Sequence, residues 1–186
     1  MTQHTSELDQ AIAQRLEPWT DRLGADRKAY FHHVLRVLRL ADLLFARSGG
    51  PGEPPSAREE FRTAAVFHDL GIWAAGTFDY LEPSCALADD WLIAQRREDL
   101  TDVVGAMIRD HHRVRPAGSA TDPTELFRRA DLIDVTFGAR RYGLPYSAYS
   151  ALTRRYPDSG FHFKLVELTV RRALIHPLSP LPMMRW

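Results

Sequence analysis

The stretch AAVFHDLG, residues 64–71, places a histidine and an aspartate side by side within an apolar run. Apolar residues precede His68 and follow Asp69, so the pattern predicts that both side chains are buried. Burying an unpaired charge is costly, and a shared counter-charge removes much of that cost. The stretch therefore indicates a core helix that carries a polar pair in need of a partner.

Two further polar residues interrupt faces that otherwise look buried. His33 lies in a long apolar helix segment, and Asp131 lies in RRADLID, residues 128–134. Imidazole nitrogens and carboxylate oxygens on rigid helices suit a divalent metal ion. A lone buried histidine is more often a hydrogen-bonded core residue, and a lone aspartate is more often a helix cap. The combination with the histidine–aspartate pair favours a metal site.

The chain is predicted to be all-α, because apolar residues recur at helical spacing along most of its length. Two start signals stand out: a capping box at Ser56 and Glu59, and the cap formed by Asp122 ahead of Pro123. Helices are expected at residues 7–17, 26–47, from 56 through the histidine–aspartate pair, 84–97, 99–112, 123–137, 145–155 and 160–176.

We find no internal repeat and no linker that would separate two domains. The sequence therefore predicts a single-domain helical bundle over residues 1–186. Its core is expected at about 26–137, with helices at 145–176 packed on it and a proline-rich tail at 177–186.

Composition excludes several classes of protein. The chain has 186 residues with 24 basic and 24 acidic side chains, so no net charge favours a nucleic-acid polymer or an anionic membrane. The one cysteine, Cys85, provides neither a disulfide framework nor a cysteine-based zinc motif, which fits a reducing compartment. The sequence shows no secretory signal and no apolar run long enough for a membrane span. We expect a cytoplasmic protein.

The order His33, then His68 and Asp69, then Asp131 on an all-helical chain resembles the HD-domain superfamily of metal-dependent phosphohydrolases. HVLRV at 33–37 is similar to the first-histidine helix of that family, AAVFHDLG to its namesake motif, and RRADLID to its last ligand. The resemblance covers about residues 26–137.

The resemblance implies a role for each matching residue. His33, His68, Asp69 and Asp131 would bind one divalent metal, which could be Zn, Fe, Mn, Ni or Co. The substrate would be a small molecule, a phosphate ester or nucleotide, hydrolysed by a metal-activated water. Asp69, His111 and His112 would take part in catalysis. The substrate would be contacted by Arg36, Phe78, Asp79 and Arg113. The alternative for Arg36 is that it pairs with a carboxylate.

Members of the superfamily with two metals carry a histidine between the namesake motif and the histidine pair, and residues 70–110 contain none. This departure argues for one metal and against a di-iron oxygenase of the same fold. A cyanamide hydratase-like enzyme acting on a small nitrile is the main alternative, with Asp79 as proton shuttle. A noncatalytic sensing or dimerisation module is the alternative outside enzymes, and a homodimer is compatible with the sequence.

Overall fold

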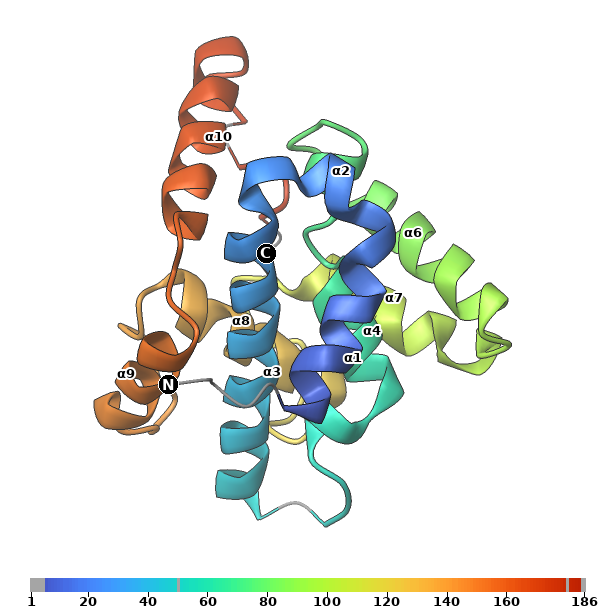
Figure 1. The fold of residues 1–186 in the computed structure, drawn as a ribbon. Coiled ribbons are helices and arrows are strands. Elements are labelled where there is room, and N and C mark those ends of the chain that lie inside the picture. The colour runs from blue at the N-terminus through green and yellow to red at the C-terminus, as the bar shows by residue number, and fades with distance from the viewer. Residues whose placement is uncertain (1–5, 50, 180, 185–186) are drawn as a thin grey trace.

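The computed structural model describes residues 6–49, 51–179 and 181–184, and within these ranges it contains helices and loops but no strand. The all-α prediction is confirmed (Figure 1). The α-helices are α1 (Glu7–Leu16), α2 (Thr20–Leu23), α3 (Arg27–Ser48), α4 (Glu59–Phe67), α5 (Gly71–Ala74), α6 (Leu81–Ala94), α7 (Thr101–Asp110), α8 (Pro123–Val135), α9 (Tyr146–Arg155) and α10 (Phe161–Ile175). Short 3-10 turns η1 (Glu17–Trp19), η2 (Gly24–Asp26), η3 (Pro55–Ala57) and η4 (Glu98–Leu100) join some of them.

Helix α3 spans the molecule and organises the core (Figure 1). Val34, Leu38 and Ala41 on one face and Val37 and Leu40 on the next are completely buried. Helices α1, α4, α8 and α9 all pack against it. Each buried valine or leucine contributes roughly 1.5–3 kcal/mol through removal of apolar surface from water. Residues on α3 are therefore held rigidly, which suits a helix that carries a ligand.

The start of α8 follows the predicted signal. The Asp122 carboxylate accepts hydrogen bonds from the backbone N–H of Thr124 at 2.9 Å and of Glu125 at 3.4 Å, and Pro123 occupies the first turn. These bonds satisfy backbone donors that have no partner within the helix. The cap fixes where the helix that carries Asp131 begins.

The capping box predicted at Ser56 is wrong. Ser56 lies in η3, and α4 begins at Glu59 after Arg58, which makes no side-chain cap. The Glu59 carboxylate instead forms two hydrogen bonds with the guanidinium of Arg15 on α1, at 2.6 and 2.7 Å. A bidentate, charge-assisted pair of this kind is stronger than a bond to a backbone amide, so a contact between helices replaces the local cap.

The histidine–aspartate pair ends α4 instead of lying within it. His68 is the C-cap residue, and Asp69 follows in the turn that leads to α5. Gly71 allows this turn to approach α6, because a Cβ atom there would lie 2.6 Å from the Tyr80 carbonyl oxygen and 2.8 Å from the Ser84 hydroxyl. The turn is thus packed on both sides, and its polar pair is directed into the core.

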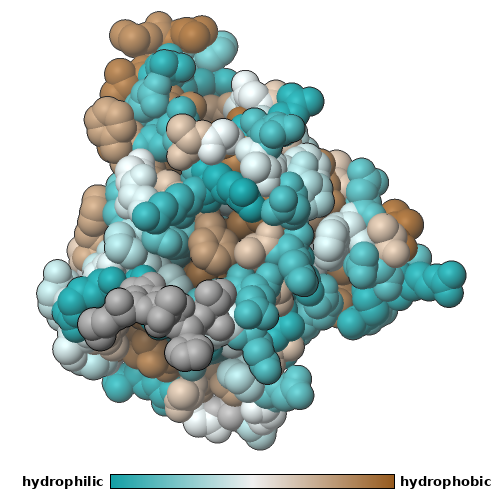
Figure 2. All heavy atoms as spheres, viewed as in Figure 1, coloured by the Kyte–Doolittle hydropathy of each residue, from teal (hydrophilic) through white to brown (hydrophobic). Residues whose placement is uncertain are grey.

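The C-terminal part lies on the other side of α3 from α1 and α4 (Figure 1). Phe161, at the start of α10, is buried, whereas Phe163, Val170 and Leu174 further along are more than half exposed. Apolar side chains gather on this projecting helix, and hydrophilic ones cover most of the rest of the visible face (Figure 2). Within the predicted tail, Met183 is buried. The single-domain division and its boundaries remain predictions.

No helix in the described ranges is long and apolar enough to cross a membrane.

Candidate metal centre

Four side chains predicted to bind a metal meet at one point inside the bundle. His33 comes from α3, His68 from the end of α4, Asp69 from the following turn and Asp131 from α8. The His33 Nε2 atom lies 3.0 Å from His68 Nε2 and 3.5 Å from Asp131 Oδ1. Asp69 Oδ2 lies 3.4 Å from His68 Nε2 and 3.8 Å from His33 Nε2. All four residues are at most 2% exposed.

Hydrogen bonds behind the two imidazoles fix which nitrogen faces the centre. His68 Nδ1 lies 2.9 Å from the Ala65 carbonyl oxygen, and His33 Nδ1 lies 2.8 Å from a carboxylate oxygen of Asp134. These oxygens accept, so each Nδ1 donates its proton and a neutral ring turns a lone pair at Nε2 toward the centre. Two such lone pairs 3.0 Å apart would repel each other unless a proton or another cation lies between them. A cation between them would remove that repulsion.

The carboxylates of Asp69 and Asp131 also have buried atoms without a partner in the described part of the chain. Within the described residues, Asp69 Oδ1 and both oxygens of Asp131 are buried without a hydrogen-bond partner. Buried polar atoms in native proteins are nearly always satisfied, so such a cluster indicates a ligand. Imidazole nitrogens and carboxylate oxygens converging on one point fit a divalent metal ion.

Charge in the cluster supports this fit. Burial alone would lower the pKa of His68, but the carboxylates of Asp69 and Asp131 outweigh burial and raise it to about 9. Burial likewise opposes ionisation of Asp69, yet His68 and His111 hold its pKa well below the ordinary value. The carboxylates therefore require positive charge beside them, from a proton on His68 or from a metal ion.

A comparison with protein families identifies the family of this chain. Residues 30–136, more than half of the sequence, match the family described as HD domain. The chain belongs to the HD-domain family. Searches of curated proteins and of solved structures found no match. Hydrolases are common among HD-domain proteins, and the family binds divalent metals, in keeping with the buried histidine–aspartate group of this chain.

Asp134 supports this HD-domain centre, although the motif alone does not predict it. It lies one helical turn after Asp131 on α8, a spacing that could have revealed it. One carboxylate oxygen binds His33, while Arg36 donates to both oxygens at 2.7 and 2.8 Å. Burial would raise the pKa of Asp134, but His33 and Arg36 lower it to about 2. Asp134 is therefore an anion that orients the His33 ring.

The predicted substrate contact of Arg36 is not what the structure has. Arg36 is 1% exposed, and its remaining donor binds the carbonyl oxygens of Tyr156 and Pro157 at 2.9 and 3.2 Å. The guanidinium donors of Arg36 therefore bind the Asp134 carboxylate and backbone carbonyl oxygens of the protein itself. The alternative expectation, pairing with a carboxylate, describes this residue, and the partner is Asp134.

The predicted histidine pair lies beside the same centre. His111 Nε2 is 3.4 Å from Asp69 Oδ1, and His112 Nδ1 is 3.9 Å from Asp131 Oδ2. Asp69 thus faces the two motif histidines with one oxygen and His111 with the other. Asp69, His111 and His112 form a second group of donors close enough to hold an ion.

Tyr80 connects this pair to the surrounding core. Its hydroxyl lies 2.9 Å from His112 Nε2 and 3.4 Å from His111 Nε2. Burial and then the charge of His111 lower the pKa of His112 to about 3, so His112 is neutral at neutral pH. Burial and then the charge of Asp69 raise the pKa of Tyr80 well above its usual value. Tyr80 is therefore a neutral hydroxyl beside neutral His112.

The structure places the two other predicted substrate contacts, Asp79 and Phe78, in different surroundings. Asp79 is exposed, and its backbone N–H donates to the Thr77 hydroxyl, while its neighbour Tyr80 is the residue that reaches the centre. The expectation that Asp79 is a proton shuttle is not met, since adjacent residues in this loop point in different directions. Phe78 packs on Tyr80, with ring centroids 6.1 Å apart, in a small apolar cluster with Ile72, Leu81 and Met183.

A small cleft is lined in part by the histidine pair, His111 and His112. Its volume is about 140 Å³. Arg113, Arg128 and Arg140 are its basic residues, and the substrate contact expected of Arg113 remains a prediction. His111 and His112 lie between this cleft and the carboxylates. The cleft is therefore the route by which a small molecule could approach the centre.

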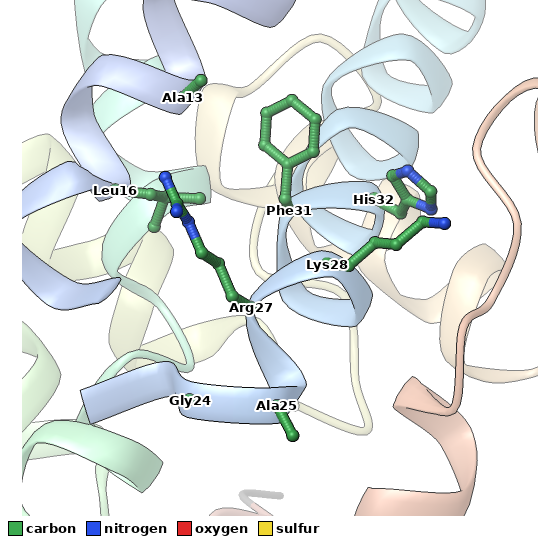
Figure 3. A pocket seen from close by; sticks show the side chains of 8 residues that line it. All are labelled: Ala13, Leu16, Gly24, Ala25, Arg27, Lys28, Phe31 and His32. Carbon is green, nitrogen blue, oxygen red and sulfur yellow. The ribbon is translucent and has the colours of Figure 1, made fainter. Parts of the chain in front are cut away.

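A larger cavity, of about 460 Å³, lies elsewhere, between α1, η2 and the start of α3 (Figure 3). Phe31 lines it together with Arg27, Lys28 and His32. None of the four candidate metal ligands lines this cavity. Its size alone does not make it the site, because the histidines that approach Asp69 and Asp131 line the smaller cleft.

Proposed function

We propose that this HD domain is a metal-dependent phosphohydrolase that acts on a small phosphate ester. The observation that supports the proposal best is the convergence of His33, His68, Asp69 and Asp131. Within the described residues their carboxylates have buried oxygens without a partner, and the neighbouring histidine pair lines a basic cleft. These four residues would hold one divalent ion. When bound, such an ion acts as a Lewis acid on a phosphoryl oxygen and lowers the pKa of water.

Asp69 has a second role in the proposal. One of its oxygens faces His33 and His68, and the other faces His111. A carboxylate shared in this way can bind the ion through one oxygen and accept a proton from the attacking water through the other. Its low pKa keeps it ionised, as binding of a metal ion requires.

His111, His112 and Tyr80 are proposed to handle the proton of the leaving group. Because His112 is neutral at neutral pH, it is not a strong acid by itself. The Tyr80 hydroxyl touches both rings and can pass a proton to a nitrogen that gives one up. The step balances when His112 Nδ1 gives its proton to the leaving group while His112 Nε2 takes one from the Tyr80 hydroxyl, and the proton that Asp69 accepts from water returns to Tyr80 through His111.

Recognition of the phosphate is assigned to the basic side of the cleft. Arg128 is already paired with Glu125, through bonds of 2.7 and 2.8 Å. Arg113 has only a distant acid, Asp110 at 3.9 Å, and Arg140 is exposed. Arg113 and Arg140 are therefore the guanidiniums with donors to offer an anion.

The proposal is tested by metal analysis and phosphate release on one pair of variants. Purified protein should contain one divalent ion per chain and release phosphate from a panel of phosphomonoesters. Asp69→Asn should lose both properties, whereas Asp79→Asn, an exposed aspartate in the same region, should keep both. Urea formation from cyanamide without phosphate release would replace the proposal with a hydratase, and full metal occupancy in Asp69→Asn would contradict the ligand assignment.

A further inference from the structure

Two methionines of the C-terminal segment, Met183 and Met184, lie near the candidate metal centre. Met183 is 5% exposed and packs in a small cluster with Ile72, Phe78, Tyr80 and Leu81. This cluster contains the tyrosine whose hydroxyl touches both histidines of the cleft. Met183 therefore anchors the segment at a fixed place beside the site.

The next residue, Met184, lines the cleft itself. It shares the cleft with the histidine pair and with Arg113 and Arg140. Val114 and Leu132 also line the cleft, so that besides its basic groups it has an apolar part to which Met184 belongs. A phosphate is attracted to the guanidiniums, and the organic group attached to it would then meet the apolar part.

The size of the cleft limits that organic group. Its volume is about 140 Å³. A cavity of roughly 150 Å³ in a protein core is filled by a molecule of the size of benzene. An organic group of about one small ring is therefore near the upper limit when its phosphate lies outside this volume, between the guanidiniums and the candidate metal ligands. A nucleoside does not fit inside unless Met184 moves.

Resting on the proposed function, we propose that Met184 is a specificity-determining residue. Its side chain, which is 43% exposed, borders the apolar side of a subsite for the leaving group. In that position it restricts the substrates to phosphomonoesters whose organic part is no larger than about one aromatic ring. The thioether side chain is flexible and unbranched, so it adapts its shape to small groups while excluding larger ones. The anchoring of Met183 keeps this side chain in place.

Phosphonates test the subsite because they carry the same anion but are not hydrolysed. Binding of methylphosphonate, phenylphosphonate and 1-naphthylphosphonate to the metal-loaded protein would be measured by calorimetry. The wild type should bind the first two and discriminate against the naphthyl compound. Met184→Ala should bind naphthylphosphonate about tenfold more tightly, the scale expected when a pocket gains room for an apolar group, with methylphosphonate unchanged. Met184→Trp should weaken phenylphosphonate selectively.

Leu178→Ala is the matched control, since Leu178 is completely exposed and does not line the cleft. This variant should leave all three affinities unchanged. Turnover of phenyl phosphate and 1-naphthyl phosphate by Met184→Ala should change mainly in KM for the naphthyl ester.

The outcomes separate the two proposals. Binding of all three phosphonates with no size preference in the wild type, or a preference that Met184→Ala leaves unchanged, would overturn the role of Met184 while leaving a phosphohydrolase intact. Failure of the metal-loaded protein to bind any phosphonate or release phosphate from any ester would overturn the proposed function together with the subsite. The subsite would be supported if the wild type discriminates against the naphthyl compound, Met184→Ala reduces that discrimination, Met184→Trp weakens phenylphosphonate as well, and Leu178→Ala changes none of the affinities.

Discussion

The two adjacent histidine pairs of this chain behave differently. His32 and His33 lie in the middle of α3, and only His33 faces the metal centre, while His32 binds the Pro157 carbonyl oxygen at 2.7 Å and lines the outer cavity. His111 and His112 lie where α7 ends, and both rings contact Tyr80 at the same centre. Within a helix, neighbours point about 100° apart. At a helix end the chain can turn, so both neighbours can reach one site.

The largest expected effect comes from the first pair. His33→Ala should lower metal affinity by more than about 100-fold, since even groups that only orient a ligand contribute 10- to 100-fold. His32→Ala should leave metal content and the unfolding midpoint nearly unchanged. Elemental analysis and thermal unfolding measure both variants, and metal loss in His32→Ala would reverse the distinction between the two histidines.

The hydrogen bond from His33 to Asp134 can be weakened without changing any candidate metal ligand. Asp134→Asn should lower metal affinity by roughly 10- to 100-fold because the His33 ring loses its charged acceptor. It should also destabilise the fold by about 3–5 kcal/mol, since the buried Arg36 guanidinium loses its counter-charge. Urea unfolding and metal titration below the melting temperature separate the two effects. Asp158→Asn is the control, because that carboxylate is 40% exposed and lies 4.0 Å from Arg36.

The second pair is tested through its shared partner. Tyr80→Phe removes only the hydroxyl that touches His111 and His112. We expect kcat to fall roughly 100-fold, the lower end of the range for a lost proton-transfer group, with metal content retained. Tyr146→Phe, at a tyrosine that is 59% exposed, should have no effect. Unchanged turnover in Tyr80→Phe would remove the proton relay from the mechanism.

The smallest effect concerns pH in protein stripped of metal by a chelator. There the pKa of His68 is raised to about 9 by Asp69 and Asp131 against the opposing effect of burial. A raised pKa stabilises the fold fully below the unfolded value of about 6.5, and this stability is lost as pH rises through 9. The unfolding midpoint of chelated protein should fall between about pH 6.5 and 9. Protein with metal should lose less over that window, and equal slopes would contradict a shared centre.

Much of the fold could be predicted from local patterns. The periodicity of apolar residues identified the segments of α3, α7, α8, α9 and α10, and the cap at Asp122 located the start of α8. The capping box at Ser56 failed because Glu59 binds Arg15 of α1 instead. A start signal is reliable when its partners are its own neighbours and fails when a remote charge competes.

The candidate site divides in the same way. The order of His33, His68, Asp69 and Asp131 could be recognised along the chain, and the structure brings their side chains together. Their roles as ligands remain a proposal. The partner of Arg36 and the opposite directions of Asp79 and Tyr80 could not be predicted, because they depend on which helices pack behind the site.

The sequence by itself determined the helical class, the family and the set of residues able to bind a metal, because helix formation and donor chemistry are properties of short segments. Only the tertiary structure decided that Asp134 supports His33, that Tyr80 joins the histidine pair and that Met184 lines the cleft. These contacts join residues far apart in the chain. Whether such side chains meet is set by how the helices pack, and no local pattern encodes that distance.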